Sequence, residues 1–170
     1  MPFANSNDFI TGRKPVPSAD TYGLVAVRFT LDMLVADLAI NTIGQIGILP
    51  AGAEPVDVRV DATDLDTGIG AGVYSIGLGN LALQNAAGAA SADAKNTLVS
   101  TIAADGGGIW GDTGVAVATA FDKPLTRTLN SMAKVQKKDY DRALVLVVTT
   151  APTTPAAGTI GVTLFYRAAQ

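Results

Sequence analysis

The chain has 170 residues, which is enough for one domain that buries roughly 70% of its unfolded surface. It contains no cysteine and no histidine, which excludes disulfides, thiolate nucleophiles, the usual zinc, copper and iron ligands, and the commonest general base near neutral pH. The net charge is −3 and no basic tract is long enough to follow a phosphate backbone, so we expect no nucleic-acid binding.

Charged residues are scarce, at 16% of the chain against about 25% in an average globular protein. A surface so poor in charge predicts that other subunits cover much of it. The C-terminal apolar run ALVLVV is far shorter than the ~20 residues that span a bilayer, and no charged start followed by an apolar stretch opens the chain. We therefore expect no membrane span, no signal peptide, and synthesis in a cytoplasm.

Residues 1–21 have no sustained hydrophobic period and contain three prolines. Phe3, Phe9 and Ile10 are the apolar points of this otherwise polar segment. One interpretation is a disordered tail, because chain termini often fray. The alternative, which we favour, is an extended arm that docks these side chains on a neighbouring subunit. The arm would precede a single domain formed by residues 22–170.

Period-two alternation predicts the first strands of that domain. In residues 22–31 the side chains of Val25, Val27, Phe29 and Leu31 fall on one face. Residues 43–49 are a second candidate, closed by the turn signal Pro-Ala-Gly. Residues 55–62 show the cleanest alternation in the chain, and residues 72–78 follow after an Asp-rich turn.

The second half is more ambiguous. Residues 93–105 predict one short helix with Asp93 as its N-cap. Strands resume at residues 115–121, and the apolar run 143–151 is typical of a central strand. Residues 159–167 alternate again, and the linker PTTPAAG before them suits a hairpin.

About seven short strands without strand–helix alternation indicate an all-β protein, an antiparallel β-sandwich. We favour the jelly-roll form, which builds two sheets from about eight strands, with one short helix and the N-terminal arm added.

Three carboxylates, Asp61, Asp64 and Asp66, crowd together before Gly68 and raise the question of a metal site. A calcium-binding EF-hand loop needs ligands at its first, third and fifth positions, glycine at the sixth and glutamate at the twelfth. A loop that starts at Asp64 fails at the last three of these, although an irregular calcium site stays open as an alternative.

Catalysis is a second interpretation of the same cluster, because paired carboxylates hydrolyse glycosides. Such pairs need aromatic sugar platforms, and here aromatic residues are 6% of the chain. No GxSxG motif, phosphate loop or Ser/His arrangement is present. We favour a third interpretation, in which the carboxylates accept backbone hydrogen bonds in a tight turn and Gly68 adopts a positive φ. The sequence thus predicts no enzyme and no catalytic, cofactor or metal site.

Two other features are weak signals. Lys134, Lys137 and Lys138 form a cluster that is usually a solvated face and alternatively meets an acidic partner. Trp110, the only tryptophan, stands between glycine-rich stretches and could serve as a sugar platform.

The order of four stretches resembles the decoration or cement proteins of tailed bacteriophages. These stretches are VRFTLDMLVADLAINTIGQIGILPAG, VDVRVDATDLDTG, NTLVSTIAADGG and ALVLVVTTAPTTPAAGTIGVTLFYR, and they span nearly all of residues 22–167. The resemblance implies a β-sandwich, often trimeric, that binds the major capsid protein on the outside of an icosahedral head and bridges neighbouring capsomers. Two alternatives remain: another virion component of the neck, tail or fibre, and a carbohydrate-binding sandwich module that uses Trp110.

Overall fold

The computed structural model describes residues 3–18, 23–68, 73–80, 115–116, 121–124 and 139–168. Within these ranges it contains eight β-strands and one short 3₁₀ helix, η1. In chain order they are β1 (Val25–Met33), η1 (Val35–Leu38), β2 (Ile43–Leu49), β3 (Ala53–Ala62), β4 (Val73–Asn80), β5 (Val115–Ala116), β6 (Phe121–Pro124), β7 (Arg142–Thr150) and β8 (Gly158–Ala168).

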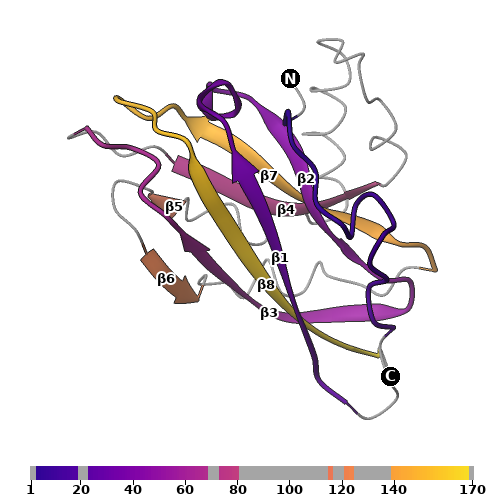
Figure 1. The fold of residues 1–170 in the computed structure, drawn as a ribbon. Helices are drawn as coiled ribbons and strands as arrows, with labels where there is room; N and C mark the ends of the chain where they lie inside the picture. Colours follow the sequence, from indigo (N-terminus) through magenta and orange to yellow (C-terminus); the bar gives the residue numbers. More distant parts are fainter. Residues whose placement is uncertain are drawn as a thin grey trace.

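The strands form two four-stranded antiparallel sheets, which lie one over the other in Figure 1. The first sheet has the order β1-β8-β3-β6 and the second the order β2-β7-β4-β5. Apart from the β4–β5 pair, strands that follow each other in the chain belong to different sheets. The predicted antiparallel sandwich is confirmed, and its strand order is compatible with a jelly roll. Among the described residues, no helix is long and apolar enough to cross a membrane.

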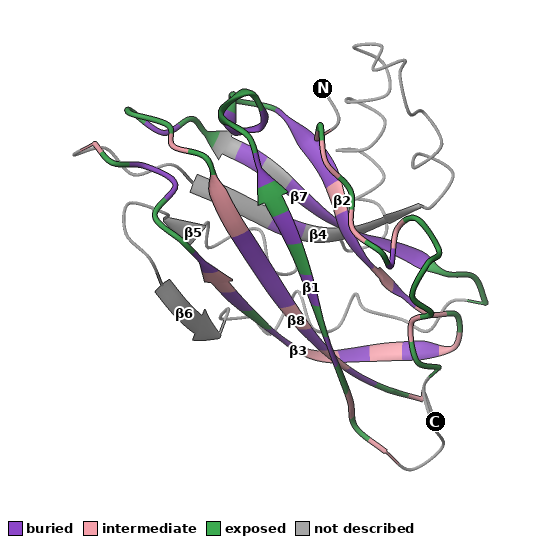
Figure 2. Ribbon diagram, in the orientation of Figure 1, coloured by how far each residue is buried: buried purple, intermediate pink, exposed green. Residues whose placement is uncertain are grey.

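The core lies between the two sheets, where the period-two pattern of each strand points its apolar face. Figure 2 shows this alternation along β1, whose inward residues Val27, Phe29, Leu31 and Met33 are buried. In β8 the buried residues Ile160, Val162, Leu164 and Tyr166 repeat the pattern. The alternation visible in the sequence is thus what places these side chains in the core.

Strand β2 presents two glycines to this core. Gly44 pairs with Leu146 and Gly47 with Leu144, and the pairing shifts between Gln45 and Gly47, so Ile46 lies in a bulge. A Cβ atom on Gly47 would lie only 2.5 Å from the Phe29 ring. The missing side chain therefore gives a β1 phenylalanine its space.

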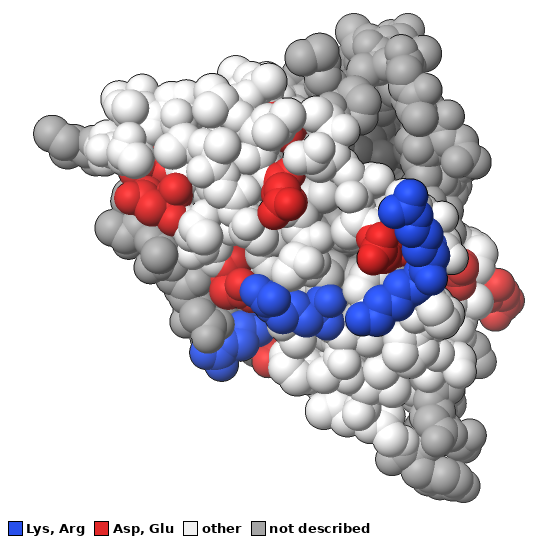
Figure 3. All heavy atoms as spheres, in the orientation of Figure 1, with Lys and Arg blue, Asp and Glu red and all other residues white. Residues whose placement is uncertain are grey.

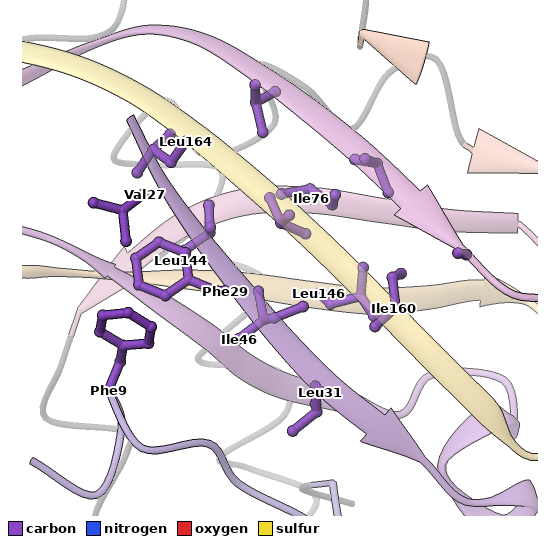
Figure 4. Packing of buried hydrophobic residues seen from close by; sticks show 14 of the residues in the cluster. Phe9, Val27, Phe29, Leu31, Ile46, Ile76, Leu144, Leu146, Ile160 and Leu164 are labelled. Carbon is purple, nitrogen blue, oxygen red and sulfur yellow. The ribbon is translucent and has the colours of Figure 1, made fainter. Parts of the chain in front are cut away.

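The N-terminal segment docks on its own sandwich. Phe9 belongs to the hydrophobic core, and its ring meets Phe29 edge-on with centroids 4.9 Å apart. Figure 4 shows the two rings next to each other. The backbone of residues 8–12 forms turns. The prediction that Phe9 docks on a neighbouring subunit is wrong, because its ring packs against Phe29 in the core of the same chain.

Three local predictions need correction or fall outside the description. Residues 115–121 were expected to form one strand, but β5 and β6 belong to different sheets. The linker PTTPAAG does not close a hairpin, because β7 and β8 also lie in opposite sheets and the linker crosses the sandwich. The short helix expected at residues 93–105 lies outside the described residues. Helix η1 was not predicted.

Candidate functional site

The Asp-rich segment follows β3, and its aspartates accept backbone hydrogen bonds as the sequence predicts. The amide N–H of Asp66 donates to Oδ1 of Asp64 over 3.1 Å, and the N–H of Gly68 donates to Oδ1 of Asp66 over 3.1 Å. Both contacts join a carboxylate to the backbone two residues on, as expected for an aspartate that stabilises a tight turn.

The Asp66 carboxylate also holds a distant segment. It is fully buried and accepts the N–H groups of Thr153 (3.0 Å, at Oδ2) and Thr154 (2.9 Å, at Oδ1). These residues belong to the linker between β7 and β8, so one carboxylate joins two loops that are far apart in sequence. Gly68 has no positive φ, and this corrects our prediction. Glycine instead lets the Thr154 side chain lie close to the backbone of residue 68, since a Cβ there would lie 2.7 Å from Oγ1 of Thr154.

This geometry bears on the metal question. Both oxygens of Asp66 face N–H donors, and Asp64 is exposed and oriented by the amide of Asp66. Among the residues that the structure describes, no three acidic side chains come together in a way that could hold a metal ion. The arrangement of Asp64 and Asp66 can therefore organise loops, and the surrounding donors suit an anionic acceptor better than a cation.

Asp61 is separate from these two carboxylates, although it is close in sequence. It lies in β3 and forms an ion pair with Arg28 of β1, across the intervening strand β8. The central strand has Gly161 at this point, where a Cβ would lie 2.5 Å from the Asp61 carboxylate. The glycine gives the ion pair room to close over the sheet. Figure 3 shows acidic and basic residues mixed on this face, with large uncharged areas between them.

A polar hollow lies between the N-terminal segment and the outer side of β1. Its charged lining residues are Asp8, Lys14, Arg28 and Asp32. Asp32 accepts a hydrogen bond from Oγ1 of Thr159 over 3.0 Å, and Asp8 lies 3.7 Å from Nη1 of Arg13. The first of these contacts lies on the outer face of the first sheet, and the second lies within the N-terminal segment itself.

The connection between β1 and β2 carries exposed apolar side chains around a buried carboxylate. Leu34, Val35 and Ile40 are 45%, 49% and 57% exposed. Asp37, only 3% exposed, accepts the N–H of Leu34 through Oδ2 and the N–H of Ala4 through Oδ1, both over 2.9 Å. Sequence reasoning missed Asp37, and its only signal was a lone acidic residue in an apolar stretch.

A buried arginine is the second residue that sequence reasoning missed. Arg142 begins β7, is 1% exposed, and donates from Nη2 to the carbonyl oxygen of Ala53 over 3.1 Å. Because Ala53 begins β3 in the opposite sheet, this contact ties the two layers together. Trp110, Lys134, Lys137 and Lys138 lie outside the described residues.

Solved phage capsid structures share this fold, whereas sequence comparisons find no match. No family profile matches the chain, and no curated protein is significantly similar to it in sequence. A chain in the capsid of Ralstonia phage GP4 superposes with a TM-score of 0.73, at 25% sequence identity and over 97% of both chains. The protein is related to phage capsid components. A chain in the capsid asymmetric unit of cyanophage Pam1 shares the fold at a TM-score of 0.53 and 16% identity, covering 90% of this chain and 91% of that one.

Proposed function

We propose that the protein is a structural component of a phage virion that binds the outside of the capsid and stabilises the shell by bridging neighbouring capsomers. The observation that carries this proposal is the end-to-end match, over 97% of both chains, to a component of a phage capsid. The match covers both strands and loops along almost the full length of the two chains.

The physical properties of the chain support the same role. A protein that acts by binding needs a rigid fold with large contact surfaces, and the described core is one continuous cluster between two sheets. The charge content of 16% leaves wide uncharged surface available for contacts with other subunits. We further propose that the protein binds the major capsid protein as a homotrimer.

The test is the copy number and the position of the protein in purified particles. Densitometry against the major capsid protein should give a ratio typical of a shell component, and a lysine-reactive label that cannot enter the head should modify the protein on intact particles. Only a few copies per particle would indicate a neck or tail component instead. Protection from the label until the head is opened would contradict an exterior position.

Rebinding tests the stabilising role. Heads from which the protein has been removed should lose their genome at a lower temperature than complete heads, and adding back the purified protein should restore the higher temperature. A matched control adds the same amount of protein that has been unfolded in urea. Equal release temperatures with and without the folded protein would contradict the bridging role.

A further inference from the structure

On one side of the sandwich, each of the two sheets ends in an edge strand. β1 is the outermost strand of the first sheet and β2 is the outermost strand of the second. Among the described strands, each of these two has a pairing partner on one side only. The backbone groups on the other side of such edge strands pair readily with strands of other molecules. Native proteins commonly cover edges of this kind with a loop or a charged segment.

Residues 3–17 run along this side and contact both edge strands. Nδ2 of Asn5 donates to the carbonyl oxygen of Asp32 in β1, and Nδ2 of Asn7 donates to that of Ile46 in β2, each over 2.8 Å. The second contact uses the carbonyl group in the β2 bulge. Asn7 is itself held in place, because its Oδ1 accepts the N–H groups of Phe9 and Ile10.

Two aromatic rings anchor the segment from the apolar side. Phe9 packs against Phe29 inside the core, and Nζ of Lys14 lies over the Phe9 ring, 4.8 Å from its centroid. Phe3 packs against the core at Gly44, where a Cβ atom would overlap the ring. Gly44 faces inward from β2 and pairs with Leu146. Because glycine has no side chain, the Phe3 ring can occupy this position, which we call the seat of Phe3.

We propose that residues 3–17 form an intramolecular strap that shields the β1/β2 edge from pairing with a second copy of the chain, and that Gly44 is the position that lets the strap close. The strap is fastened at both ends. Near its start the N–H of Ala4 donates to Asp37, and near its end the hydroxyl of Tyr166 donates to the carbonyl oxygen of Pro17. This role is independent of the proposed function.

The first test measures hydrogen exchange in the full chain by mass spectrometry of the N-terminal peptide. Gly44→Ala should raise the exchange rate of the Ala4 amide by about tenfold. The added Cβ displaces the Phe3 ring, and losing the burial of that ring favours the open form of the segment by about this factor. Phe3→Ala should give a similar rise without altering β2. The double variant should exchange no faster than either single variant, because both substitutions remove the same contact.

A control variant separates strap release from general weakening of the sandwich. Gly161→Ala also adds a methyl group to a strand glycine, but its Cβ meets Asp61 and Arg28 and not the strap. This variant should leave exchange in the N-terminal peptide at the wild-type rate. Additive effects of Phe3→Ala and Gly44→Ala, or wild-type exchange in both single variants, would overturn the assignment of Gly44 as the seat.

The second test measures self-association by sedimentation velocity. Gly44→Ala and Phe3→Ala should both form species larger than the wild type forms at the same concentration, and Gly161→Ala should not. If exchange of the Ala4 amide rises while sedimentation stays that of the wild type, the segment is only a structural appendage and its shielding role is overturned. If Gly44→Ala fails to fold, Phe3→Ala alone decides both points.

Discussion

At the scale of single residues, Asp66 shows how one buried carboxylate can organise two loops. Its oxygens accept the N–H groups of Gly68, Thr153 and Thr154 at distances of 2.9–3.1 Å. Hydrogen bonds to an ionised acceptor are stronger than neutral ones, and a buried N–H without its acceptor is costly. The neighbouring carboxylate of Asp64 accepts one N–H at an exposed position. The two aspartates should therefore differ in their effect on stability.

We expect Asp66→Ala to lower the free energy of unfolding by about 2–4 kcal/mol, because it leaves buried N–H donors unsatisfied. Asp64→Ala should cost less than about 1 kcal/mol, since water can reach the freed N–H group. Urea denaturation of both variants and the wild type measures the difference. Equal losses for the two variants would contradict the role that we assign to Asp66.

A chelator control distinguishes this explanation from a metal site in the same loop. EDTA should leave the melting temperature of the wild type unchanged, because the Asp66 oxygens already face N–H donors. A fall in melting temperature that calcium reverses would instead show that the Asp64/Asp66 turn holds a metal ion.

At the scale of elements, the strands were predictable because burial on one face imposes a period of two. Six predicted strands match β1, β2, β3, β4, β7 and β8 to within a few residues at each end. Sheet membership was not predictable in the same way. The linker of residues 151–157 has the turn-forming composition of a hairpin, yet it crosses between sheets. The composition of a linker indicates that the chain turns there, but it does not indicate which sheet the next strand joins.

The long-range contacts of the loops and of the strap were also beyond the sequence. The local turn at Asp64 and Asp66 could be predicted, because its hydrogen bonds join residues two apart. The partners Thr153 and Thr154 are separated from Asp66 by 87 and 88 positions. Phe9 likewise stands in a segment without period, so nothing local indicated that its ring enters the core.

Strand β8 is joined to the end of the strap through Tyr166, and this contact predicts a pH dependence. Burial raises the pKa of the Tyr166 hydroxyl from 10.0 to about 12. A pKa that is higher in the folded state means that the stabilisation is fully present below pH 10 and is lost as the pH rises toward 12. Urea midpoints should therefore fall across this window in the wild type.

The matched variants for this pH effect are two Tyr→Phe substitutions. Tyr166→Phe should be less stable at neutral pH, because Pro17 loses its donor, and should show a shallower decline above pH 10. Tyr140→Phe removes a tyrosine that is 44% exposed and should keep the wild-type decline. A Tyr166→Phe variant with the wild-type pH profile would show that other groups cause the loss.

At the scale of the whole molecule, sparse charge is the property that most needs an explanation. The first sheet's outer face carries the ion pairs Arg28–Asp61 and Arg167–Glu54, whose side chains are 28–55% exposed. Exposed pairs of this kind contribute little to stability. These few charged residues help to hydrate a face that is otherwise uncharged. Such a face loses little hydration when it is buried on assembly.

We therefore expect the purified protein to self-associate, as a trimer, at micromolar concentration. Contacts between surfaces with few charges depend mainly on apolar burial. The trimer should therefore persist when the salt concentration is raised. Association through ion pairs would instead weaken, because salt screens the charges. Sedimentation equilibrium at low and high salt measures both points. A monomer under both conditions would remove the inference from surface composition, and a trimer that dissociates in high salt would show that charged pairs hold the subunits together.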